Sequence, residues 1–297
     1  MNSLTFTCEI ITPMFLNGAD GKTPELRPPS IKGALRFWWR ALNGHLSLDD
    51  LRKQEAEIFG GTDEKVGRSK IVIRTSHSNL HQERFNMLPH KKDNESPSPP
   101  QAYEPSQTFT VTLALTSTRK NFDLDKLESL FVLTCLLGGL GKRSRRGFGA
   151  IWITEKDNNI FSMPNTLNGE NGILNLIKKF NPHYAIDNPT TPNKIQLKKP
   201  SPLNGQYSND YPYIEEIYIG HTPKSYLDLV KGIGSATHHH KDNSNGSANP
   251  RFASPVYISA IKDGNNVKSI VTKLNYANQK STPTTQKQSD LIKDALK

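Results

Sequence analysis

A glycine-rich, strongly basic loop is the part of this 297-residue sequence with the most evident chemistry. Residues 136–151 read LLGGLGKRSRRGFGAI and hold five glycines and four cations, Lys142, Arg143, Arg145 and Arg146. Glycines let backbone N–H groups approach phosphate oxygens closely, and the basic side chains add charge-assisted hydrogen bonds. The composition of the loop therefore suits a polyanionic ligand such as a nucleic acid.

Spacing excludes two kinds of nucleotide-binding loop. A P-loop would need glycine where Leu136 stands and serine or threonine where Arg143 stands. A dinucleotide fingerprint starting at Gly139 meets Ser144 in place of its third glycine, and the loop follows a helix pattern rather than a strand. Two interpretations stay open, a nucleic-acid clamp and a solvated turn whose glycines end the preceding helix.

A second basic element lies nearer the N-terminus. Lys32, Arg36 and Arg40 recur at every fourth position, so they share one face of an expected helix, with Trp39 beside that face. No acidic residue occurs between residues 26 and 46, so salt bridges within the helix do not account for these cations. The pattern favours phosphate binding with base stacking on Trp39, and a solvated cationic face is the alternative.

Histidines give a weaker indication of chemistry. Three consecutive side chains, His238–His240, cannot converge on one ion from a regular helix or strand, so we predict no metal site and no cofactor. His45, one turn after Arg40, is the candidate acid–base residue if the protein is a ribonuclease. Three more histidines fall in expected loops, namely His77, His81 and His90.

Composition narrows the class of protein. Lysine and arginine outnumber aspartate and glutamate by 38 to 28, which favours polyanionic partners. Two cysteines, Cys8 and Cys135, lie in apolar segments without disulfide or zinc spacing, which fits a reducing compartment. The N-terminus lacks a leader pattern and no apolar run reaches a membrane-spanning length, so we expect a soluble, cytoplasmic protein.

The first half of the chain must position both basic elements, and its patterns predict a βαββαβ order. We expect strands at 4–12, 70–76, 108–116 and 150–154, and helices beginning after Ser30, at Ser47 with an Asp50 capping box, and at Asp123. Within the first helix, Phe37 and Trp38 are expected core or interface anchors. A polar stretch of about 30 residues containing NESPSPPQ separates the second and third strands, as an insertion or a partly disordered segment.

The second half is patterned less clearly. We expect a helix near 172–180, a strand near 213–220, a helix beginning with Pro223, and strands at 252–261 and 266–274, with a polar loop over 235–250. The fold class is therefore α+β, with ferredoxin-like (RRM-like) βαββαβ architecture in the first half and a second α/β unit after it. The expected divisions are 1–154 with the glycine-rich loop at 138–149, 155–278, and a C-terminal tail or short helix at 279–297.

Several of these motifs resemble a known family. GLGKRSRRGFG (139–149) has the G-x-G-x5-G-x-G spacing of the RAMP superfamily of CRISPR-associated proteins, between the last helix and last strand of a ferredoxin-like domain. The stretch ITPMFLNGAD...TPELRPPSIKGALRFWWRALNG, with EAEIFGG and RFASPVYIS, is similar more narrowly to the first subunit of the type III-B Cmr effector complex. The likeness is dense over 8–61 and 136–154.

This resemblance implies tandem ferredoxin-like domains and a non-catalytic, RNA-binding subunit that caps the complex near the 3′ end of the guide RNA and helps engage target RNA. Its implied partners are guide and target RNA and other RAMP subunits. The matching RNA-binding positions are Lys32, Arg36, Trp39, Arg40, Gly139, Gly141, Lys142, Arg143, Arg145, Arg146, Gly147 and Gly149. Two alternatives stay open, a guide-processing endoribonuclease of the same superfamily and a protein–protein scaffold anchored by Phe37 and Trp38.

Overall fold

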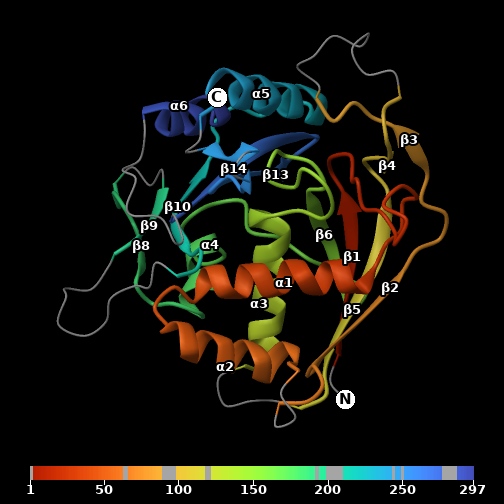
Figure 1. Ribbon diagram of the computed structural model, residues 1–297, viewed down its shortest axis with the longest axis vertical. Coiled ribbons are helices and arrows are strands. Elements are labelled where there is room, and N and C mark those ends of the chain that lie inside the picture. Colours follow the sequence, from red (N-terminus) through yellow and green to blue (C-terminus); the bar gives the residue numbers. More distant parts are fainter. Residues whose placement is uncertain are drawn as a thin grey trace.

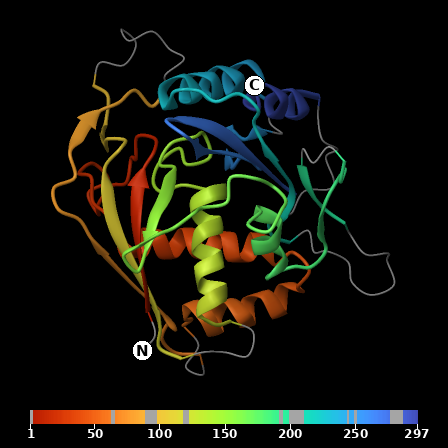
Figure 2. The same cartoon turned by 180° about the vertical axis from the view of Figure 1, so that it is seen from behind.

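The computed structural model describes residues 3–62, 66–88, 98–117, 122–190, 194–198, 210–242, 245–248, 251–275 and 286–297. In this part of the chain the architecture is mixed α/β, with two five-stranded antiparallel sheets. Figures 1 and 2 show the two sheets on opposite sides of the molecule, with helices between them and at one end. No helix of the described segments combines the length and apolar character needed to cross a membrane.

The first sheet has the connectivity predicted for the first half. Its main elements are β1 (Ser3–Ile10), α1 (Pro28–Leu42), α2 (Leu48–Phe59), β2 (Ile71–Ser76), β5 (Thr108–Leu115), α3 (Leu124–Leu137) and β6 (Ile151–Lys156). The strand order is β2-β5-β1-β6-β7, where β7 (Asn159–Ile160) is a short addition. The central pairs are antiparallel, as in Phe6 opposite Val111, so the alternating apolar residues of β5 face one core.

The polar stretch between β2 and β5 contains more structure than predicted. Its β3 (Gln82–Arg84) and β4 (Gln101–Tyr103) pair as a separate antiparallel hairpin. Met14 and Tyr103 exchange two backbone hydrogen bonds of 3.0 Å, which tie this hairpin to the loop after β1. The first residues of NESPSPPQ, 94–97, lie outside the described residues.

Helix starts follow local capping chemistry, with one correction. The Ser47 side chain accepts a hydrogen bond from the Asp50 backbone N–H, and Asp123 caps α3 in the same way, as predicted. The prediction that Ser30 caps α1 is wrong, because the helix already begins at Pro28 and its N-cap residue makes no side-chain bond. Proline fits the first helical turn, where no intrahelical partner awaits its missing N–H.

The second sheet repeats part of this connectivity. Its elements are α4 (Ile173–Lys178), β8 (Tyr184–Ile186), β9 (Lys194–Leu197), β10 (Ile214–Ile219), α5 (Tyr226–His239), β13 (Val256–Asp263), β14 (Asn266–Leu274) and α6 (Gln286–Ala295). The order is β13-β14-β10-β9-β8, and β11 (Ser247–Ala248) pairs with β12 (Arg251–Phe252) apart from it. The run β10-α5-β13-β14-α6 matches β1-α1-β2-β5-α3, whereas β9 holds the place beside β10 that β6 holds beside β1.

Helix α5 differs from its prediction at both ends. It begins at Tyr226 with Ser225 as its cap, so Pro223 lies before the helix. It continues to His239, so the loop predicted over 235–250 is wrong for its first residues. Alanine and threonine in this segment are compatible with helix continuation, which the polar composition of 235–250 does not reveal.

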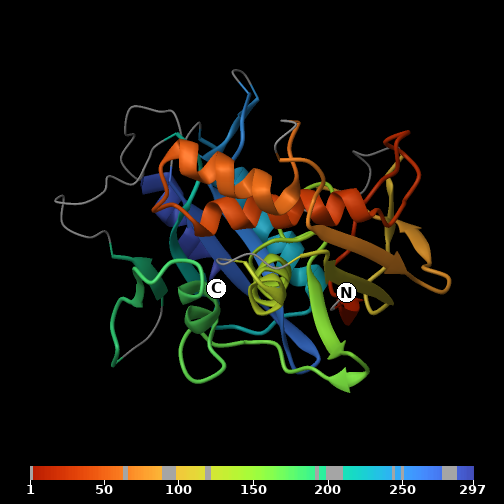
Figure 3. The same ribbon diagram turned by 90° about the horizontal axis from the view of Figure 1, so that it is seen from below.

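Both halves contribute to one continuous hydrophobic core, with α3 at its centre. Ten residues of α3 between Leu127 and Leu137 are buried, and this helix touches α1, β6, β13 and β14. Figure 3 shows α3 nearly end-on beneath α1 and α2. Cys8 and Cys135 are buried free thiols in this core, and burial raises the pKa of both. The boundary expected after residue 154 falls inside β6, so the division into domains stays a prediction.

Candidate nucleic-acid interface

The glycine-rich loop is fastened to the chain segment that follows β1. The Leu140 backbone N–H donates to the Gly149 carbonyl at 2.9 Å, which closes the base of the loop. The Lys142 N–H donates to the Phe15 carbonyl at 2.9 Å, and the Gly149 N–H donates to the Pro13 carbonyl at 3.0 Å. These three bonds use the N–H groups of Leu140, Lys142 and Gly149 within the protein, so these donors are not available to phosphate, and the bonds hold the loop against the segment after β1.

Its glycines are needed for this packing. Gly141, Gly147 and Gly149 have φ values of +89°, +81° and +67°, a region that other residues rarely adopt. A Cβ at Gly149 would collide with the Leu140 carbonyl oxygen, and one at Gly139 would lie 2.8 Å from the Gly149 oxygen. The glycines of the motif therefore shape the loop, and its ligand-binding capacity rests on the side chains between them.

We expect Gly149→Ala to lower the free energy of unfolding by about 2–5 kcal/mol, the sum of left-handed backbone strain and a backbone clash. Gly264→Ala is the matched control, because Gly264 has φ +60° but a Cβ added there would meet no atom within 4 Å, so only strain of about 1–2 kcal/mol applies. Chemical denaturation of both variants measures the difference. Equal losses would show that the loop relaxes around the added methyl group.

Arg146 faces the protein interior rather than a ligand. Its guanidinium donates to the carbonyls of Val256 at 3.0 Å, Asn245 at 3.2 Å and Arg145 at 2.9 Å. Burial, followed by the charges of Arg143 and Arg145, lowers the pKa of Arg146 to about 10, so it is charged at neutral pH. This side chain joins the loop to the second half of the chain.

Arg145 also connects the loop to the second half of the chain. Its guanidinium hydrogen bonds to the Ser254 carbonyl and lies 4.5 Å from the ring centroid of Tyr257 and 5.7 Å from that of Phe37. Trp38 stacks edge-on against Tyr257 at 5.1 Å, so the two anchors predicted on α1 meet β13 here. The backbone completes the contact, because the Gly147 N–H donates to the Ile258 carbonyl at 2.7 Å and covers the free edge of β13.

Lys142 and Arg143 are the cations of the loop that remain for an external ligand. Lys142 is exposed, and its Nζ lies 2.9 Å from the Gly21 carbonyl. Arg143 has φ +60°, and its Nε is buried without a hydrogen-bond partner in the described part of the chain. Burial lowers the pKa of Arg143. Because Arg145 and Arg146 make their hydrogen bonds within the protein, Lys142 and Arg143 are the strongest candidates for an RNA contact within the loop.

The cationic face of α1 is paired across to α2. Glu55, whose side chain is 9% exposed, accepts from Arg36 Nε at 2.8 Å and from an Arg40 terminal nitrogen at 3.0 Å. The two arginine side chains stay 40% and 39% exposed. Lys32 lies one turn before Arg36, and burial, followed by the Arg36 charge, lowers its pKa. The absence of acids within α1 was therefore misleading, since the counter-charge comes from another helix.

We expect Glu55→Gln to lower the free energy of unfolding by about 1–3 kcal/mol, because two arginines lose a charged acceptor. The same change frees Arg36 and Arg40 and raises affinity for single-stranded RNA if these side chains contact phosphate. Asp49→Asn, an exposed change on the same helix, is the control and should alter stability by less than about 0.5 kcal/mol. Lower stability with unchanged RNA affinity would assign the α1 cations a structural role alone.

Trp39 is not exposed on the cationic face of α1, which corrects the sequence prediction of base stacking on that face. It is 3% exposed and packs edge-on against Phe59 at 6.3 Å. Its position in the sequence, between Arg36 and Arg40, did not reveal that α2 covers this face of α1. Trp38 is 1% exposed and Phe37 is partly buried against the core, as expected of anchors.

The histidines are dispersed. His238 and His239 lie in the last turn of α5, and His240 Nε2 pairs with Asp294 Oδ2 of α6 at 2.7 Å. His77 and His81 fall between β2 and β3, and His90 lies outside the described residues. In the described segments, no group of three or more histidine, cysteine or acidic side chains is arranged to hold a metal ion.

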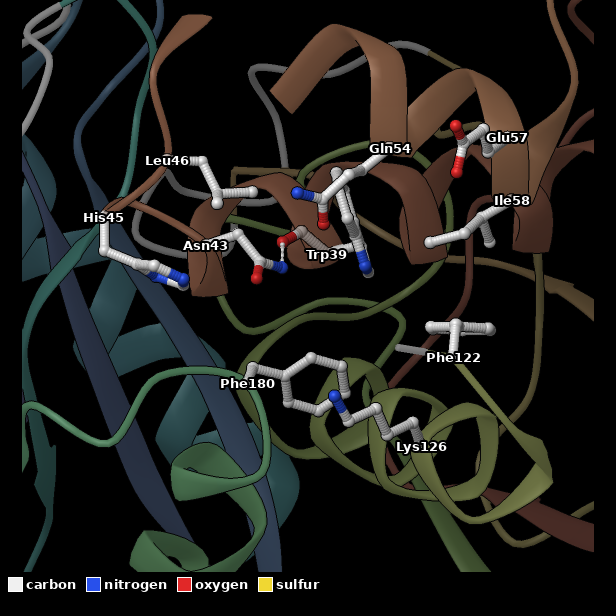
Figure 4. A pocket seen from close by; sticks show the side chains of 10 residues that line it. All are labelled: Trp39, Asn43, His45, Leu46, Gln54, Glu57, Ile58, Phe122, Lys126 and Phe180. Atoms are coloured by element: carbon white, nitrogen blue, oxygen red, sulfur yellow. Dashed lines mark hydrogen bonds between the residues drawn. The ribbon is translucent and has the colours of Figure 1, made fainter. Parts of the chain in front are cut away.

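A pocket of about 400 Å³, which the sequence patterns did not indicate, opens beside the C-terminal end of α1. Figure 4 shows its lining, which comes from α1, the turn after it, α2, the start of α3 and the residue Phe180. His45 lies at this pocket, and burial, followed by the charges of His183 and Lys126, lowers its pKa. The lining residues are Trp39, Asn43, His45, Leu46, Gln54, Glu57, Ile58, Phe122, Lys126 and Phe180.

Comparison with protein families decides what kind of domain presents the loop and α1. The model of the RAMP superfamily matches residues 7–152. These residues form a RAMP-superfamily domain. The RAMP domain includes α1, α2 and the complete glycine-rich loop, so both basic elements belong to it.

Two curated relatives of this chain are CRISPR subunits from Pyrococcus furiosus. CRISPR system Cmr subunit Cmr1-2 is 27% identical over 183 residues, covering 51% of this chain and 95% of the relative. CRISPR system Cmr subunit Cmr1-1 is 33% identical over 153 residues, covering 46% of this chain and 43% of the relative. The alignment thus spans less than half of the second relative.

Solved structures share the fold over nearly the full chain. The apo form of Cmr1 from Pyrococcus furiosus matches with a TM-score of 0.61 at 19% identity, covering 98% of this chain and 93% of that chain. A chain of the type III-B Cmr-beta complex bound to cognate target RNA matches with a TM-score of 0.59 at 12% identity, covering 99% of both chains. The likeness therefore extends the common fold beyond the RAMP domain into the second half.

Proposed function

We propose that this chain is an RNA-binding, non-catalytic subunit of a type III-B CRISPR–Cas (Cmr) effector complex in the cytoplasm. It caps the complex near the 3′ end of the guide RNA and helps capture target RNA in antiviral defence. The observation that carries the proposal is that the RAMP domain contains both basic elements, while curated relatives of the chain are Cmr subunits.

The repeated connectivity supports tandem ferredoxin-like domains as part of this proposal. The second sheet repeats the order of the first up to its last helix, and β9 fills the position of the missing final strand. Ferredoxin-like sheets are a common scaffold of RNA-recognition modules. The division into 1–154, 155–278 and 279–297 belongs to the same proposal.

The RNA contacts in this proposal come from side chains on two rigid supports. The loop contributes the exposed Lys142 and the partly buried Arg143, and the face of α1 adds Lys32 with the half-exposed Arg36 and Arg40. Cations of this kind bind the phosphate backbone without reading sequence, and their effect falls with salt. Gly139, Gly141, Gly147 and Gly149 contribute by shaping the loop.

Reconstitution tests the role in the complex. The chain is mixed with the other Cmr subunits and a guide RNA, and binding of labelled complementary target RNA is measured with and without it. We expect the chain to co-elute with the complex in gel filtration and to raise target affinity. Separate elution, or target capture that is unchanged when the chain is left out, would refute the proposal.

A guide-processing endoribonuclease is the second candidate, favoured by the surroundings of His45. Its lowered pKa leaves the ring neutral at neutral pH and able to accept a proton, with Lys126 at the same pocket. Incubation of purified protein with repeat RNA in the presence of a chelator tests this candidate. Our proposal expects no discrete product, and a product that disappears in His45→Ala would establish the enzyme instead.

A further inference from the structure

We propose that the pocket between α1, α2 and the start of α3 binds one nucleotide, holding its base between apolar walls and its phosphate near Lys126. The inference deepens the proposed RNA-binding role and rests on it, because single-stranded RNA is the source of the nucleotide. The walls, the polar groups and the charge at the opening each support this occupant.

The walls match a flat, apolar ligand. Trp39 and Ile58 belong to α1 and α2, while Phe122 and Phe180 come from the opposite side, and all four are less than 10% exposed. In Figure 4 these two groups of side chains face each other across the pocket. Burial between aromatic and aliphatic side chains is how proteins hold an unstacked base, and a volume of about 400 Å³ lies within the range of small-molecule sites.

Several polar groups at the pocket have donors or acceptors that could bind a ligand. In the part of the chain that the structure describes, neither the Trp39 indole nor the Gln54 amide makes a hydrogen bond. Asn43 uses its amide N–H on the Trp39 carbonyl at 2.7 Å, which leaves its side-chain oxygen as an acceptor. The Glu57 carboxylate adds a second acceptor without an ion pair in the described residues. Base edges present both donors and acceptors, so this mixed set suits a base better than a lipid or an inorganic anion.

Charge separates the base end of the site from its phosphate end. Glu57 lies on α2, whereas Lys126 lies on α3, and Figure 4 shows the two side chains on opposite sides of the pocket. Lys126 supplies a positive charge at the same pocket as His45. A phosphate is favoured at this side, and the acidic side favours a base with N–H donors.

Short RNAs test the site directly. RNA trinucleotides with a base at the central position alone are compared with fully abasic trinucleotides for binding to the intact protein. We expect the base to tighten binding about five-fold or more, since stacking on aromatic side chains contributes about 1–3 kcal/mol per base. Equal affinities would overturn the proposal, and this comparison needs no protein variant.

Two variants locate the effect. Gln54→Phe fills the pocket from a partly exposed position, and Gln54→Ala removes the amide, and we expect each to erase most of the base-dependent gain. Lys142→Ala should weaken both trinucleotides equally, which makes it the matched control. A base-dependent gain that persists in Gln54→Phe places the base elsewhere and overturns the proposal.

The outcomes also separate this site from the proposed function and from a free ligand. Absence of binding to any RNA would refute the RNA-binding role, whereas RNA binding without base dependence would refute the pocket alone. AMP, GMP, CMP and UMP are titrated in parallel. Tighter binding of a mononucleotide than of the matching trinucleotide would overturn the assignment to RNA.

Discussion

Arg146→Ala lowers the free energy of unfolding by about 3–5 kcal/mol in our account, one of the two largest single-residue losses that we expect. Arg146 is a partly buried cation whose guanidinium donates to three carbonyls, including those of Asn245 and Val256 far along the chain. Hydrogen bonds from a charged donor contribute about 1.5–3 kcal/mol each, and all three are lost in the variant. Urea denaturation followed by circular dichroism measures the loss.

The control for this prediction is Lys142→Ala, four positions earlier in the same loop. Lys142 is exposed, so its replacement should change stability by less than about 0.5 kcal/mol. If Arg146→Ala were as stable as Lys142→Ala, the hydrogen bonds of Arg146 to the second half of the chain would contribute nothing to the free energy of unfolding. The loop arginines could then all be assigned to a ligand again.

The second large effect is on RNA binding. Combined replacement of Lys142 and Arg143 by alanine should weaken binding of single-stranded RNA about 25-fold at 0.1 M salt. The size of this effect follows from a salt slope of about 0.7 per neutralised phosphate, so losing two contacts lowers the slope by about 1.4. A salt titration of both proteins by fluorescence anisotropy gives the slope and the affinity together.

A control must separate the effect of lower net charge from the effect of losing cations at these two positions. Lys53→Ala combined with Lys178→Ala removes two exposed cations from α2 and α4, and it lowers net charge by the same amount. We expect its salt slope to stay close to that of the unmodified protein. Equal slopes for all three proteins would contradict the assignment of Lys142 and Arg143, since general attraction to the basic chain would then explain the binding.

Sequence patterns predicted the local structure of the first half well, because they are set by neighbours in the chain. The alternation of apolar residues predicted β5, and the capping residues Ser47 and Asp123 predicted the starts of two helices. The helical spacing of apolar residues predicted the buried face of α1, which includes Trp38. The glycine-rich loop lies between α3 and β6, as its sequence position predicted. Each of these features depends on residues within one or two turns.

The roles of the basic residues depended on distant parts of the chain and could not be read locally. Arg146 binds carbonyls about a hundred positions away, and Arg36 and Arg40 are paired by Glu55 of another helix. A run of cations looks the same in sequence whether it is solvated, paired or bound to phosphate. Tertiary structure alone separated Lys142 from Arg146.

The pocket was missed for a related reason. Its lining comes from four separate segments and consists of residue types that occur throughout any protein, such as Gln54 and Phe180. Of the lining residues, His45 and Trp39 had a signal in the sequence, as a histidine near a basic helix and as an aromatic residue beside its cationic face. The burial that lowers its pKa depends on how α1, α2 and α3 pack together.

Isolation of the chain with its bound RNA tests the central claim most directly. The chain carrying an affinity tag is purified from the organism that encodes it, and the RNA retained with it is sequenced beside the same preparation of the Lys142→Ala, Arg143→Ala variant. Our account predicts guide RNAs containing CRISPR repeat sequence together with Cmr subunits, and a marked loss of RNA from the variant. Recovery of the chain without CRISPR RNA and without Cmr subunits would contradict it.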